Sequence, residues 1–133
     1  MALTFLKIKS FENNSKATIH KSGKLGFNAE AQEKYLVGEK LNVKIALSQE
    51  FEDSKGVEGG LFLFVTPLED EETLPVAKSG DYYYINTKSI FDHYEIDYVK
   101  NKIMFDIFEE TIDGMDVLKL KRREWEREKT RKK

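Results

Sequence analysis

The sequence predicts an α+β protein whose strands form a mainly antiparallel sheet or barrel. Short segments that alternate apolar and polar residues recur along the chain, which is typical of half-buried strands. Two short helix-forming stretches each follow one such segment and precede another. The order of these segments repeats, since Asn86 lies 58 positions after Asn28 and Ile103 lies 60 positions after Val43. We therefore expect two tandem strand–helix–strand–strand units related by pseudo-twofold symmetry.

Composition limits the class of protein. A chain of 133 residues suits one domain or two small halves that share a core, and nine Phe and six Tyr supply large apolar side chains. With no cysteine, the chain forms neither a disulfide nor a thiolate metal site. Lys7 and Lys9 interrupt the opening segment, unlike a secretory leader, and the longest apolar run, 61–65, is too short for a bilayer. We expect a cytoplasmic protein with no membrane partner.

The first unit is expected at residues 1–68. Asn28 is a good N-cap for a helix over 29–35, and Gly23 suits the turn before it. An acidic, glycine-containing loop is expected over 50–60. The strands of this unit are predicted at 4–11, 16–20, 25–27, 41–45 and 61–65.

An acidic linker is expected at residues 69–80, where four acidic residues precede Pro75 and Gly80. The second unit follows at 81–120. Asn86 is expected to open a helix over 87–94, and residues 111–114 have turn chemistry. Strands of the second unit are predicted at 83–85, 103–107 and 117–120.

Residues 121–133 form a basic C-terminal helix or tail in this prediction. The charge along the chain is uneven. Residues 1–48 hold eight Lys and four Glu, residues 49–118 hold five Lys and seventeen acids, and residues 119–133 hold nine Lys or Arg and three Glu. The net charge of −2 therefore conceals two basic ends and an acidic middle. A polyanionic ligand would bind only to a face from which the acidic middle is absent.

No motif of an enzyme is present. Ser22-Gly23-Lys24 resembles the end of a phosphate-binding loop, but its earlier glycine is missing and a leucine follows the lysine. There is no dinucleotide fingerprint and no nucleophile elbow. His93 and Asp97 have i, i+4 spacing, which a surface helix end explains better than a metal site. We expect a non-catalytic protein with no cofactor and no metal.

The segment from Lys16 to Ile45 resembles the AbrB/SpoVT swapped-hairpin DNA-binding module. Residues 21–25, Lys-Ser-Gly-Lys-Leu, match the basic turn of that family, and residues 35–41 approximate its helix exit. The resemblance covers residues 16–67. It implies a dimeric or pseudo-dimeric β-barrel that presents basic residues to duplex DNA, and the tandem layout is similar to that of MraZ proteins. Phe27-Asn28 and Glu33-Lys34 depart from the family pattern, and the second half lacks the basic turn.

We therefore expect a nucleic-acid-binding protein, for DNA rather than RNA, that could also form a homo-oligomer. Lysines of the first unit would contact phosphates, and the C-terminal arm would add further cations. The candidate residues are His20, Lys21, Lys24, Lys40, Lys44, Lys121, Arg122, Arg123 and Arg127. A variant of this hypothesis is single-strand binding on aromatic residues at 82–84 or at Phe62 and Phe64.

Two other interpretations stay open. The lysines could be solubilising residues that discourage pairing at strand edges. The protein could then be an interaction or structural assembly subunit with no nucleic-acid role, whose acidic middle and basic ends contact complementary patches on its neighbours.

Overall fold

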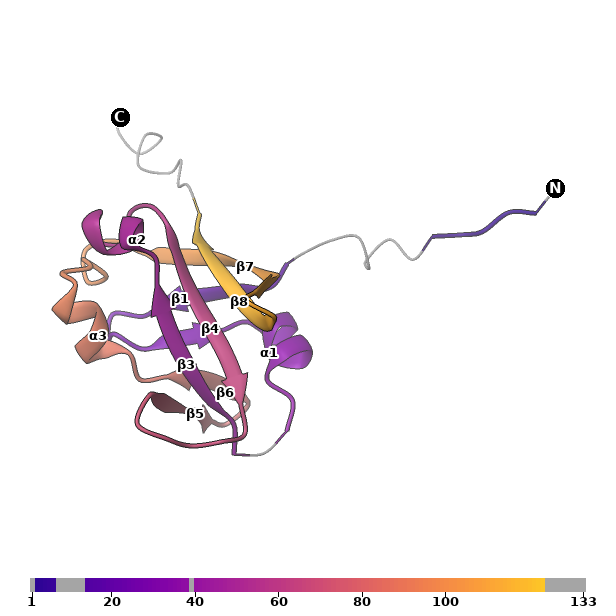
Figure 1. Ribbon diagram of the computed structural model, residues 1–133, viewed down its shortest axis with the longest axis horizontal. Helices are drawn as coiled ribbons and strands as arrows, with labels where there is room; N and C mark the ends of the chain where they lie inside the picture. Colours follow the sequence, from indigo (N-terminus) through magenta and orange to yellow (C-terminus); the bar gives the residue numbers. More distant parts are fainter. Residues whose placement is uncertain (1, 7–13, 39, 124–133) are drawn as a thin grey trace.

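The computed structural model describes residues 2–6, 14–38 and 40–123. Within these residues, eight strands form a closed antiparallel barrel and three short helices lie at its ends (Figure 1). The strands are β1 (Lys16–Ile19), β2 (Leu25–Phe27), β3 (Asn42–Leu47), β4 (Gly60–Thr66), β5 (Thr73–Ser79), β6 (Tyr82–Ile85), β7 (Ile103–Ile112) and β8 (Met115–Arg122), and the helices are α1 (Ala29–Tyr35), α2 (Gln49–Asp53) and α3 (Lys88–His93). The predicted α+β class with a mainly antiparallel sheet is confirmed.

The barrel closes in the order β1-β2-β6-β5-β3-β4-β8-β7, with β7 pairing to β1. Every neighbouring pair is antiparallel. Successive side chains of a strand point to opposite faces, so alternate residues of each strand fill the interior. The strands contribute these buried apolar residues to the core: Ala17, Ile19, Leu25, Phe27, Val43, Leu61, Leu63, Ile85, Ile103, Phe105, Ile107, Leu118 and Leu120.

Each helix places an apolar side chain in this core. Phe51 of α2 and Phe91 of α3 are fully buried, and the Phe51 ring lies 6.4 Å from that of Phe105 in β7. Ala31 of α1 is also fully buried. Replacing a buried Phe with Ala in such a core costs about 3–5 kcal/mol. The short helices are therefore held by the barrel, because helices of this length are marginal on their own.

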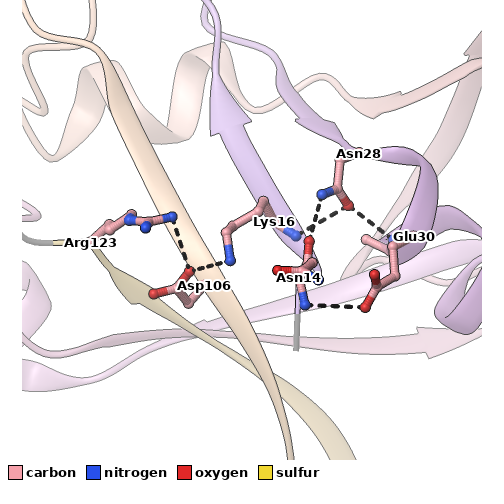
Figure 2. A network of polar contacts seen from close by, with 7 residues as sticks. Asn14, Lys16, Asn28, Glu30, Asp106 and Arg123 are labelled. Atoms are coloured by element: carbon pink, nitrogen blue, oxygen red, sulfur yellow. Dashed lines mark hydrogen bonds and ion pairs between the residues drawn. The ribbon is translucent and has the colours of Figure 1, made fainter. Parts of the chain in front are cut away.

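Asn28 caps α1 as its sequence position predicts. Its Oδ1 accepts hydrogen bonds from the backbone N–H of Ala31 at 3.0 Å and of Lys16 at 3.2 Å. Its Nδ2 donates to the carbonyl of Asn14 at 2.6 Å, and Glu30 accepts from the Asn14 N–H (Figure 2). One side chain thus joins the start of β1 to the start of α1.

The expected linker at 69–80 is wrong for residues 73–79, which form β5. This strand pairs with β3 on one side and β6 on the other. Its sequence, Thr-Leu-Pro-Val-Ala-Lys-Ser, has low strand propensity and contains a proline, which lacks a backbone donor. Pairing with the adjacent β6 and with β3, about 30 residues earlier, therefore stabilises β5 more than its own sequence does.

The predicted start of α3 and the predicted loop at 50–60 also differ from the structure. The α3 N-cap is Thr87 rather than Asn86, and it makes no side-chain capping bond. The expected loop at 50–60 begins within α2, where Ser48 Oγ accepts from the N–H of Phe51 at 3.1 Å and of Gly60 at 3.0 Å. A capping serine therefore starts a helix within an acidic segment.

The last hairpin is longer than predicted. The β7 strand includes Thr111 and Ile112, so the turn is confined to Asp113 and Gly114. Lys121 and Arg122 belong to β8 rather than to a C-terminal tail, and residues 124–133 lie outside the described residues. Of the strand expected at 4–11, residues 4–6 are described and form no strand, and the remainder also lies outside the described residues.

The β1–β2 turn packs on the beginning of α3. Gly23 is buried with φ +87°, and a Cβ there would come within 2.7–3.0 Å of the Cγ, Cβ and Cα of Lys88. The fully buried Thr87 donates its hydroxyl to the Gly23 carbonyl at 2.8 Å. Glycine is required here by both the backbone conformation and the close approach of the helix.

We predict that Thr87→Val lowers the free energy of unfolding by about 1–3 kcal/mol, because it leaves the buried Gly23 carbonyl without its donor at nearly constant volume. Urea unfolding followed by circular dichroism measures the change. Thr18→Val, the same substitution at a half-buried position on the outside of β1, is the control and should change stability by less than about 0.5 kcal/mol. Equal effects at both positions would contradict the role of the Thr87 hydrogen bond.

Candidate nucleic-acid interface

Strand register defines the outer surface of the barrel around β1. Thr18 pairs with Gly26 of β2 and with Met104 of β7. Ala17 and Ile19, which precede and follow Thr18, are buried, so Thr18 faces outward. Its partners Gly26 and Met104, and the residues two positions away from each along the strands, face outward with it. The same register, continued by one step, places His20 opposite Lys102.

Several lysine and arginine residues gather on the outer surface of four adjacent strands, β8, β7, β1 and β2, and at the ends of these strands. We call this surface the basic face. Its positively charged residues are Lys16, Lys24, Lys102, Lys119, Lys121 and Arg123. Among the described residues, two carboxylates form ion pairs with these cations, namely Asp106 and Glu110, whose Oε2 lies 3.9 Å from Lys119 Nζ.

Asp106 is shared by two cations of the basic face. Its Oδ1 lies 2.8 Å from Lys16 Nζ and 3.8 Å from Arg123 Nη1 (Figure 2). One negative charge therefore faces two positive charges, and the surface stays positive around it. Both ion pairs are partly exposed, so each stabilises the fold by at most about 1 kcal/mol.

A groove runs along one end of the basic face, between the β1–β2 turn and the loop before β7. Its volume is about 400 Å³, and its walls include His20, Lys21, Tyr98, Lys100 and Lys102. None of the three groove lysines forms an ion pair with a described carboxylate. Lys24 and Lys121 likewise form no ion pair with a carboxylate among the described residues. These ammonium groups are therefore available to an anionic ligand.

The predicted site residues fall into separate groups. His20, Lys21, Lys24, Lys121 and Arg123 lie on the basic face or at its groove. Arg122 has the opposite strand parity from Lys121, and its Nη1 donates to the carbonyl of Gly56 at 3.2 Å. Arg127 lies outside the described residues.

Lys40 and Lys44 are not brought to the basic face. Lys40 lies two residues before β3 and Lys44 lies within it, and the neighbours of β3 are β4 and β5. Lys44 Nζ lies 3.3 Å from Glu72 and 3.4 Å from Asp70. Hydrogen bonds to Glu72 and then to Asp70 raise the pKa of Lys44, so it is charged but already neutralised.

Sequence reasoning missed Lys16, Lys100, Lys102 and Lys119. Lys100 and Lys102 stand about 80 positions from the β1–β2 turn in the sequence, and the β1–β7 pairing alone brings them beside it. Their sequence holds only a weak signal, namely two lysines just before an alternating strand.

The groove wall is fastened to α3 through Asp92. The hydroxyl of the buried Tyr98 donates to Asp92 Oδ1 at 2.5 Å, and Lys88 Nζ lies 2.8 Å from Asp92 Oδ2. The hydrogen bond from Lys88 and then that from Tyr98 lower the pKa of Asp92, and the same bond to Asp92 raises the pKa of Tyr98. This contact holds the loop that carries Lys100 against the helix on which the turn packs.

The described part of the chain has no group of three His, Asp or Glu side chains placed to hold a metal ion. None of its helices is both long enough and apolar enough to cross a bilayer.

Comparison with known proteins gives no relative: no family model, no curated protein and no solved structure matches the chain. The resemblance to the AbrB/SpoVT module therefore stays a prediction.

We predict that Tyr98→Phe raises the pKa of Asp92 toward its ordinary value, and that Lys88→Met raises it further, because Lys88 makes the larger contribution. A carboxyl-carbon NMR titration measures both. Folding lowers the pKa of Asp92, so its contribution to stability is present above the unfolded pKa and is lost as pH falls through the folded pKa. An Asp92 midpoint that neither substitution moves would contradict this network.

Proposed function

We propose that the protein is a non-catalytic nucleic-acid-binding protein, with DNA as its ligand, and that the basic face contacts the phosphates. The observation that carries the proposal is the gathering of six lysine and arginine residues on one outer surface, together with the groove lysines Lys21 and Lys100, where only Asp106 and Glu110 form ion pairs with these cations among the described residues. A duplex or single strand offers closely spaced phosphates to such a surface, and release of their counterions supplies much of the binding free energy.

Only part of the acidic middle lies away from the basic face. Asp70 and Glu72 lie against Lys44 on the β3 side of the barrel. At the β8 edge of the basic face the charges are mixed: Glu50 and Glu58 line a hollow together with Lys119 and Lys121, and Glu110 lies 3.9 Å from Lys119. The phosphate contacts are therefore expected on the β1–β2 side, at Lys24 and the groove lysines, where repulsion by the acidic middle is weakened by distance and salt.

We also propose that the chain consists of two tandem units related by pseudo-twofold symmetry. The strand order supports this proposal. If each strand from β1 to β4 is exchanged with the strand four later in the chain, every pair of neighbours in the barrel is again a pair of neighbours. Gly26 and Tyr84, 58 positions apart, pair with each other, as residues on such an axis would. The hairpin β1–β2 also lies beside the hairpin β5–β6, as expected for a swapped-hairpin module. The exchange is inexact, because α2 separates β3 from β4 whereas a two-residue turn separates β7 from β8.

We predict that Lys21→Gln/Lys24→Gln weakens binding to DNA by roughly 10-fold or more at low salt. If both lysines contact phosphates, the slope of log K against log[salt] should fall by about 1.8. Fluorescence anisotropy with labelled single-stranded and duplex oligonucleotides measures both quantities. Lys34→Gln/Lys55→Gln changes the net charge equally, but at lysines paired with Glu30 and Glu95, and it is the matched control.

Equal losses in the test and control variants would contradict the basic face as the binding surface. A chain ending after Arg123 retains all of β8, and it measures the contribution of the remaining C-terminal cations, including Arg127.

One observation favours the alternative of an assembly subunit. Phe108, Ile112 and Met115 are exposed on one side of the β7–β8 hairpin, at 41%, 38% and 45% of their surfaces. Apolar side chains gathered in this way are common at protein interfaces. A protein that binds no DNA at low salt and self-associates as its concentration increases would support this alternative instead.

A further inference from the structure

Two tyrosines extend the basic face onto β6. Along this strand Ile85 is fully buried and Tyr83 packs against the core, so Tyr82 and Tyr84 point outward by alternation. The β6 strand pairs with β2, and Gly26 is directly opposite Tyr84. The two outward rings therefore stand next to Lys24 and His20 rather than on a separate surface.

The Tyr82 ring lies across β2. Its hydroxyl lies over Gly26, in the space that a Cβ at that position would fill, and it forms a hydrogen bond with Nε2 of His20 on the far side. The His20 ring meets the Tyr82 ring edge-on, with centroids 5.5 Å apart and planes at 66°. Glycine at position 26 thus lets an aromatic ring rest on the sheet.

The Tyr84 ring continues the surface made by Tyr82. The two ring centroids are 6.5 Å apart and the planes differ by 22°, so the rings are nearly parallel. Nζ of Lys24 lies 4.7 Å from the Tyr84 centroid in a cation–π contact. We call Tyr82 and Tyr84 the aromatic shelf. Lys24 lies over the Tyr84 ring of this shelf, and the groove lysines lie beyond His20.

We infer that the ligand of the basic face is a single-stranded nucleic acid, whose unpaired bases stack on the aromatic shelf while the lysines contact its phosphates. This inference rests on the proposed function and deepens it. Stacking on a ring requires an exposed base face, and base pairing and stacking hide those faces within a duplex.

The spacing of the shelf gives a second argument. Successive bases in one strand of B-form DNA are about 3.4 Å apart along the axis. The two rings are 6.5 Å apart, so two neighbouring bases that each meet one ring must separate from each other. A single strand can do this, whereas a duplex would have to open. The exposed cations Lys21, Lys100 and Lys102 lie at the groove, where the strand would continue.

The test compares Tyr82→Leu/Tyr84→Leu with the unmodified protein for three ligands: a 12-nucleotide dT strand, the corresponding rU strand and a 12-base-pair DNA duplex. We expect the dT and rU affinities to fall by roughly 10-fold per ring, as is usual when a stacking aromatic is removed. Duplex affinity should change by less than about 2-fold. The ratio of the dT and rU affinities of the unmodified protein decides between DNA and RNA.

Phe108→Leu is the matched control, since it removes an exposed aromatic ring from the β7–β8 hairpin. Gly26→Ala is a second test, in which the new methyl group displaces the Tyr82 hydroxyl while both tyrosines and all lysines remain. It should weaken single-strand binding and leave the duplex unaffected. Thermal melts confirm that each variant is folded. In Tyr82→Trp, quenching of the new indole by dT would report stacking directly, with the signal of the native Trp125 subtracted.

Failure of the inference differs from failure of the proposed function. If dT, rU and duplex all bind and neither shelf variant changes their affinities, the shelf is not used and the phosphate contacts remain. A duplex preference that the shelf variants do not alter would likewise overturn the inference. If the unmodified protein binds none of the three at low salt, the proposed function itself is wrong.

Discussion

Pairing of β1 with β7 is the constraint on which the rest of the structure depends. It joins residues 16–19 to residues 103–106 and turns an eight-stranded sheet into a closed barrel. Closure fixes which side of each strand faces the core, because a shift of one residue in the pairing register would turn every core-facing side chain of that strand toward the solvent. It also places Lys102 opposite His20 and Asp106 opposite Lys16. The charge arrangement on the outside therefore follows from the packing on the inside.

Small residues and buried polar contacts then determine the local shape of the basic face. Gly23 lets the β1–β2 turn lie on α3, and Gly26 leaves the space that the Tyr82 ring crosses. Thr87 and Asp92 tie the same helix to the turn and to the loop before β7. These positions carry no charge toward a ligand themselves, with the exception of Asp92. They hold the lysines and tyrosines in fixed relation, which reduces the entropy lost on binding.

Local features of the fold were predictable, and features made by distant pairing were not. Alternation located β1 and β3, and the capping role of Asn28 follows from its side chain and the helix-forming run after it. The β5 strand was mistaken for a linker because the acidic residues before it and Pro75 resemble a loop, while its partner β3 lies about 30 residues earlier in the sequence. The α2 helix was missed because Ser48 starts only five residues of helix.

The same distinction applies to the candidate site. The basic turn at 21–24 is a local motif and was recognised, whereas the contribution of Lys100 and Lys102 depends on the pairing of β1 with β7. Lys44 was assigned to the site as one of the lysines of the first unit, but Asp70 and Glu72, which precede β5, form ion pairs with it. The charged residues of a sequence therefore predict a binding surface only when it is known which of them form ion pairs with one another in the folded protein.

The interleaved order of the strands has a consequence for how the chain folds. Each of β1, β2, β3 and β4 has one neighbour from among themselves and one from β5–β8. During synthesis, β2 lacks its outer partner until residues 84–85 have left the ribosome and β1 lacks its own until residues 103–106 have done so, and the outer backbone groups of each strand stay solvated until then. Folding should therefore be late and cooperative, and slow for a domain of this size, because contacts so distant in sequence must form together.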